Sequence, residues 1–71
     1  MLVAGREFSD GILARIRLRV EGDPLLTRTA LSREVCGWLG WQGADGQPKD
    51  MSCRVALLEL SRRGIIELPA G

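Results

Sequence analysis

The sequence contains no histidine and no tyrosine, and it has only one phenylalanine and two cysteines among 71 residues. Without histidine or a C-x-x-C pair, a zinc site would lack its usual ligands, so we expect no metal. The Cys53 thiol also has no histidine to activate it, and the carboxylates of Asp45, Asp50 and Glu59 form no evident catalytic pair. The sequence therefore predicts neither an enzyme nor a cofactor.

The two cysteines, Cys36 and Cys53, are interpreted as small apolar core residues of a reduced, cytoplasmic protein. A disulfide between them stays open as an alternative for an oxidising compartment. No secretory segment is recognisable, and no apolar run approaches the roughly 18–20 residues that a membrane span needs. We therefore expect no membrane partner.

The net charge is small: ten Lys and Arg against nine Asp and Glu give +1. This balance gives little support to strong nonspecific binding of nucleic acid. However, nine of the ten positive residues are arginine, the residue best suited to forked contacts with phosphate or guanine. Residues 1–33 carry six arginines against four acids. The composition thus permits a local basic patch.

The length predicts one small domain over residues 1–71, with a core of Leu, Ile and Val and with Trp38 and Trp41 as large fillers. Residues 1–8 are expected to be extended. Capping residues and apolar spacing predict helices from Ser9 to about 21, from about 28 to 39 after the cap Thr27, and from 48–51 to about 63. Gly40 and Gly64 are expected to end the second and third helices.

The third helix is unusually apolar. Met51, Val55 and Leu58 form one row, and Cys53, Ala56, Leu57 and Leu60 form a second row on roughly the opposite side. This pattern predicts a central helix that is buried on two sides. A short strand over residues 65–68, stopped by Pro69, is expected to follow it.

This order of elements is that of a winged helix-turn-helix domain, whose third helix enters the major groove and whose next strand opens the wing. About ten residues separate the second and third helices, more than a strict helix-turn-helix uses. The strand over 65–68 could instead pair with residues 2–4. The predicted fold class is mainly α: a three-helix, winged helix-turn-helix-like domain with a short two-stranded β element formed near the two termini.

The sequence resembles the N-terminal segment of the DruA family of the Druantia anti-phage system, and the leader domain of related bacterial transposase-like proteins. The resemblance covers nearly the whole chain and rests on a set of short motifs: Gly5-Arg6-x-Phe8, Leu31-Ser32-x-x-Val35-Cys36, Trp41, Asp45-Gly46, Lys49-Asp50-Met51-x-Cys53-Arg54, Leu57-x-x-Leu60 and Arg63-Gly64-x-Ile66-x-Leu68-Pro69. It implies that the chain is the N-terminal domain of a longer protein, and that a downstream domain is its partner.

Candidate nucleic-acid contacts lie on the second and third helices. Arg54, in the first turns of the third helix, is the leading candidate for base or phosphate contact, although it could instead brace the fold by pairing with Asp50. The remaining candidates are basic or hydroxyl side chains near the same helices: Arg28, Arg33, Lys49, Ser52, Arg62 and Arg63. Each of these is alternatively an ordinary solvated surface residue.

Two functions follow from these patterns. The first is a DNA-binding module that brings a downstream DNA-processing domain to its target. The second is a protein-interaction or self-association module on the same fold that uses the apolar wing and the third helix against a partner or against the missing downstream domain. The order of elements, the arginine usage and the resemblance favour the first, whereas the small net charge favours the second.

Overall fold

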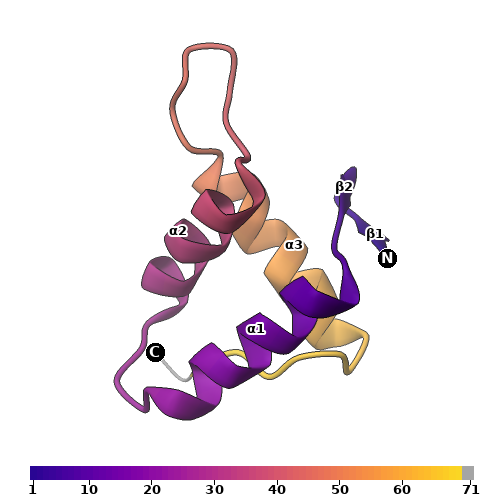
Figure 1. The fold of residues 1–71 in the computed structure, drawn as a ribbon, viewed down its shortest axis with the longest axis vertical. Coiled ribbons are helices and arrows are strands. Elements are labelled where there is room, and N and C mark those ends of the chain that lie inside the picture. The colour runs from indigo at the N-terminus through magenta and orange to yellow at the C-terminus, as the bar shows by residue number, and fades with distance from the viewer. Residues whose placement is uncertain (70–71) are drawn as a thin grey trace.

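The computed structural model of this protein consists of three helices and one two-stranded antiparallel sheet (Figure 1). The elements, in chain order, are β1 (Leu2–Val3), β2 (Arg6–Glu7), α1 (Asp10–Gly22), α2 (Arg28–Leu39) and α3 (Asp50–Arg62). The structure describes residues 1–69, and the last two residues of the predicted domain lie outside the described residues. The predicted mainly α fold is confirmed. No helix in the described range is long and apolar enough to cross a membrane.

The ends of the helices are set by local chemistry, as the sequence predicts. The Ser9 side chain accepts a hydrogen bond from the amide of Ile12 at 3.2 Å, and Thr27 caps α2 in the same way through the amide of Ala30 at 3.1 Å. Gly40 follows α2 in the left-handed conformation, with φ of 61°, and it donates back to carbonyls of the last turn. These caps fix where the chain turns.

The sheet is a hairpin at the N-terminus. Leu2 pairs with Glu7 and Val3 pairs with Arg6, and the turn between the strands places both Ala4 and Gly5 at positive φ, 51° and 77°. Positive φ at both central residues is the requirement of a tight type I′ hairpin. The expectation that residues 2–4 could pair with a C-terminal strand is therefore wrong.

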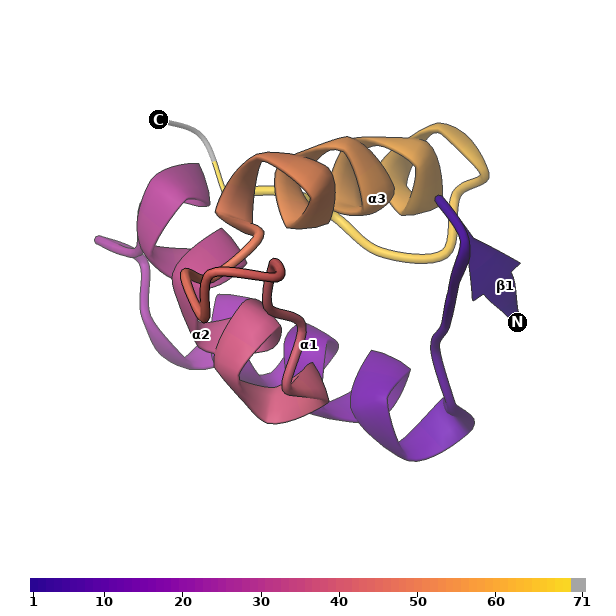
Figure 2. The same ribbon diagram turned by 90° about the horizontal axis from the view of Figure 1, so that it is seen from above.

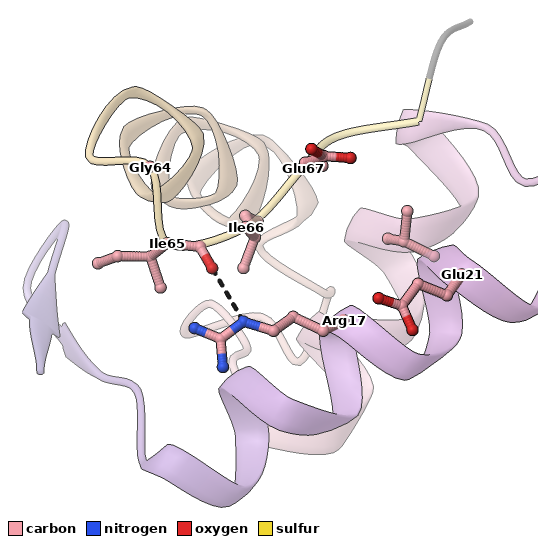
Figure 3. A pocket seen from close by; sticks show the side chains of 7 residues that line it. Arg17, Glu21, Gly64, Ile65, Ile66 and Glu67 are labelled. Carbon is pink, nitrogen blue, oxygen red and sulfur yellow. Dashed lines mark hydrogen bonds between the residues drawn. The ribbon is translucent and has the colours of Figure 1, made fainter.

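Residues 65–68 form no strand, and the described part of the chain contains no strand of a wing. Instead, this C-terminal segment runs from the end of α3, past α1, to the start of α2 (Figure 1). Its Ile66 and Pro69 side chains are buried. Arg17 of α1 donates from Nε to the carbonyl oxygen of Ile65 at 2.9 Å (Figure 3). Packing and side-chain hydrogen bonds therefore hold the segment where a strand was expected.

The three helices surround one core. Its fully buried large side chains come from the N-terminal segment and from every helix, and they include Phe8, Ile16, Leu31, Leu57 and Leu60. Cys36 and Cys53 are buried free thiols at the contact of α2 with α3. The interpretation of both cysteines as core residues agrees with this arrangement.

Helix α3 is buried on one side only. Its inner row, predicted from the sequence, is buried as expected: Cys53, Ala56, Leu57 and Leu60. The other row is exposed, with Met51 at 66%, Val55 at 60% and Leu58 at 41% of its full accessible surface. The prediction of a helix buried on two sides is wrong, because α1 and α2 both lie on the same side of α3 (Figure 2).

Candidate nucleic-acid interface

The outer face of α3 combines apolar and basic side chains. Met51, Val55 and Leu58 recur at helical spacing along it, and we call these three residues the outer row. Arg54 is exposed beside this row, and its Nη1 atom lies 3.7 Å from the Met51 sulfur. A thioether is a weak acceptor, so the guanidinium keeps its donors for another group. The alternative that Arg54 braces the fold through Asp50 finds no ion pair between them in residues 1–69.

The start of α3 is fixed by backbone hydrogen bonds rather than by a capping side chain. The amide of Lys49, the residue before the helix, donates to the carbonyl oxygen of Trp41 at 3.0 Å. The Lys49 side chain is exposed, whereas Ser52 is half-buried. Asp50 occupies the first turn, where a carboxylate interacts favourably with the helix dipole but opposes a bound phosphate.

Two arginines of α2 lie beside the N-terminal half of α3. Arg28 lines a cavity of about 170 Å³ together with Arg54 and Leu58 of α3. Arg33 lines a second cavity with Pro48 and Asp50. The tertiary structure therefore brings the predicted residues of α2 and of early α3 onto one side of the molecule. Arg28 also donates from Nε to the carbonyl oxygen of Pro69 at 2.9 Å.

Arg62 and Arg63 lie at the opposite end of α3. The helix has 13 residues, so at 1.5 Å per residue its two ends are about 20 Å apart. Both are exposed, but Arg63 forms an ion pair with Glu59 at 3.0 Å, one helical turn away, whereas Arg62 forms none within the described residues. No strand follows them in the described chain, so their predicted place at the entry to a wing is not present.

The basic residues divide into two groups according to their contacts. Six of the ten are held by other parts of the fold: Arg6 by the Leu39 carbonyl, Arg15 over the Trp38 ring, Arg17 by the Ile65 carbonyl, Arg19 by Glu34 and Asp23, Arg28 by the Pro69 carbonyl and Arg63 by Glu59. The other four form no hydrogen bond to an oxygen and no aromatic contact within the described residues: Arg33, Lys49, Arg54 and Arg62. Arg54 and Arg62 lie on α3, Lys49 directly precedes it, and Arg33 lies on the α2 surface beside its start.

The electrostatics elsewhere serve the fold. Arg19 lies between Glu34, at 2.7 Å, and Asp23, at 3.2 Å, which joins the end of α1 to α2. The hydrogen bond from Arg19 holds the pKa of Glu34 below its ordinary value. Burial raises the pKa of the Cys53 thiol to about 12, which keeps it protonated at neutral pH. The Arg19 ion pairs thus link α1 to α2, and the Cys53 thiol stays protonated in the core.

The outer row was missed as a surface feature by reasoning from the sequence. Its spacing was visible, but two opposite apolar rows on one helix read as two buried faces. The available signal was the length, because a chain of 71 residues has little material for a second layer over its central helix.

No protein-family model, curated protein or solved structure matches this chain. The resemblance to the DruA family therefore remains a prediction that rests on the motifs in the sequence.

Proposed function

We propose that this domain binds duplex DNA through the outer face of α3 and serves as the targeting module of a larger DNA-processing or anti-phage defence protein in the bacterial cytoplasm. The observation that carries the proposal is the placement of Arg33, Lys49, Arg54 and Arg62. These are the cations left without an internal oxygen or aromatic partner in the described residues, and they lie on α3, directly before it, or on α2 beside its start.

The shape of the molecule suits this role. Helix α3 lies along one edge, with α1 and α2 both behind it (Figure 2). A helix with its side chains is about 10–12 Å wide and fits the major groove, which is about 12 Å wide. In that position Arg54 can reach guanine edges or a phosphate with its forked donors. Arg33 and Lys49 near one end, and Arg62 at the other, can contact the backbone.

The small number of lysine and arginine side chains available for DNA limits the expected affinity. About three phosphate contacts give a slope of log affinity against log salt of about −3. Binding by the isolated domain is therefore expected to be weak at physiological salt and much stronger at low salt. In the proposed longer protein, the downstream domain would add the missing affinity and the chemistry, while this domain itself carries no catalytic role and no cofactor.

A titration with duplex DNA at two salt concentrations tests this function. We expect binding that falls steeply with salt and that weakens in an Arg54→Gln variant. Arg15→Gln is a matched control, because Arg15 is an exposed arginine of α1 whose guanidinium stacks over Trp38. Circular dichroism should show that both variants stay folded. The absence of binding to any duplex at low salt would overturn the proposal.

A second function, protein interaction or self-association, is favoured by one specific observation. The outer row exposes three apolar side chains in succession, between 41% and 66% of their full accessible surface. Exposed apolar patches often mark protein interfaces. Sedimentation across a range of protein concentrations tests self-association. A mass that rises with concentration, and that returns to the monomer value in Val55→Ser, would support this second function.

A further inference from the structure

If α3 enters the major groove as proposed above, the outer row faces the edges of the base pairs. Building on the DNA-binding function proposed above, we infer that Met51, Val55 and Leu58 select duplexes with thymine at the positions they cover. The basis is the chemistry of the surface, because the residues at the centre of the outer face of α3 cannot form strong hydrogen bonds with bases.

The dimensions of the outer row match a short run of base pairs. Met51 and Leu58 are seven residues apart, which corresponds to about 10.5 Å along the helix axis. Successive base pairs are 3.4 Å apart, so the row spans about three steps. Met51 and Val55 keep 66% and 60% of their full accessible surface, whereas Leu58 keeps 41% and borders the cavity that it lines with Arg28. Helices α1 and α2 lie on the opposite side of α3 (Figure 2).

The four bases differ in the free energy gained or lost when an apolar side chain contacts their major-groove edge. Guanine, cytosine and adenine present hydrogen-bond acceptors or donors and no methyl group there, whereas thymine presents a methyl group beside one acceptor. A donor or acceptor that loses water without a new partner is destabilising, but a methyl group gains from leaving water. Val55 at the centre of the row therefore favours a thymine methyl over any other edge.

Arg54 adds a polar position next to this apolar surface. It is the sequence neighbour of Val55, and its Nη1 atom lies 3.7 Å from the Met51 sulfur, at the border of the row. A guanidinium fork matches the two acceptors of guanine. The preferred sites are therefore expected to place one guanine beside a run of thymine-containing base pairs.

Replacing thymine by deoxyuridine in the DNA tests the inference, because deoxyuridine lacks only the methyl group. Duplexes that bind the domain are first selected from a random-sequence pool. Each thymine of a selected site is then replaced in turn, and the dissociation constant is measured. We expect about a fourfold loss of affinity for each contacted methyl. For the Val55→Ala variant, the loss of affinity caused by deoxyuridine should become smaller at one thymine position of the selected site.

Leu18→Ala is the matched control, since Leu18 is an exposed leucine on α1, at 69% of its full accessible surface. This variant should keep the full effect of deoxyuridine. Salt-dependent DNA binding with equal affinity for thymine and deoxyuridine duplexes would overturn the inference and leave the proposed function intact. Failure to bind any duplex at low salt would overturn both.

Discussion

The Nε atom of Arg28 donates a hydrogen bond to the carbonyl oxygen of Pro69 at 2.9 Å. This contact ties the first turn of α2 to the far end of the C-terminal segment. Arg17 forms the equivalent contact with the Ile65 carbonyl at the beginning of the same segment, beside a cavity of about 300 Å³ between the segment and α1 (Figure 3). Two arginine side chains thus donate hydrogen bonds to backbone carbonyl groups that, in a sheet, would accept hydrogen bonds from a neighbouring strand.

Removing the Arg28 contact should destabilise the domain. For Arg28→Ala we expect the free energy of unfolding to fall by about 1 kcal/mol, because a hydrogen bond to a charged donor is lost at a partly buried site. Urea unfolding followed by circular dichroism measures this change. Arg33→Ala is the control on the same helix: Arg33 is exposed like Arg28 but forms no hydrogen bond to an oxygen within the described residues, so the expected change is within about 0.5 kcal/mol. Equal effects of the two variants would contradict the structural role of Arg28.

Arg62 and Arg63 should differ in their contribution to DNA binding. Arg63 is engaged with Glu59 at 3.0 Å, whereas Arg62 is exposed and forms no ion pair within residues 1–69. We expect Arg62→Gln to reduce the slope of log affinity against log salt by about 0.9, the value for one lost phosphate contact, and Arg63→Gln to reduce it less. Titrations at several salt concentrations compare the two slopes. Identical slopes for the neighbouring variants would show that the ion pair does not decide which arginine binds.

The stability of the domain should decrease at alkaline pH because of Cys53. Burial raises the pKa of this thiol from 9.0 to about 12. Above pH 9 the unfolded thiol ionises while the folded thiol stays protonated, so ionisation favours the unfolded state. The contribution of the protonated Cys53 thiol to the free energy of unfolding is fully present below pH 9 and is lost as the pH rises toward 12. At pH 10, one unit above the unfolded pKa, the expected loss is about 1.4 kcal/mol.

Urea unfolding between pH 8 and pH 10.5 measures this loss. The Cys53→Ala variant is less stable at every pH, because it leaves a cavity in the core, but its stability should depend less on pH. A pH dependence as steep as that of the unmodified protein would assign the effect to other groups.

The hairpin turn offers a stabilising substitution. Ala4 adopts a φ of 51°, in the left-handed region that costs an ordinary residue about 1–2 kcal/mol. Asparagine tolerates this conformation, and Asn-Gly is a preferred pair for a type I′ turn. We expect Ala4→Asn to raise the free energy of unfolding by about 1 kcal/mol. Thermal unfolding checks this, and an unchanged or lower melting temperature would contradict the strain at Ala4.

Much of the helical architecture follows from local signals. Ser9 and Thr27 are caps because their side chains reach amides three residues later, and Gly40 ends α2 because the chain there must turn left-handed. Each of these interactions joins residues that are close in sequence, so the pattern alone is sufficient. The N-terminal hairpin escaped prediction because its turn begins with alanine, a residue that rarely adopts positive φ.

The segment 65–68 shows the limit of local reasoning. Two adjacent isoleucines before a proline are typical of a strand, but a strand also needs a partner with free backbone groups. The partner available to Leu2 and Val3 was their own hairpin neighbour. The C-terminal segment is therefore held by its buried side chains and by arginines from α1 and α2.

By itself, the sequence determined the three helices, their limits and the inner row of α3, because these depend on spacing and capping over a few residues. Only the tertiary structure decided which row of α3 faces solvent and which cations remain available. Those outcomes depend on contacts between distant residues, such as Arg17 with Ile65, which are 48 positions apart. The candidate interface consists of basic side chains that have no internal partner in the described residues. It can be identified only when the partners of the other basic side chains are known.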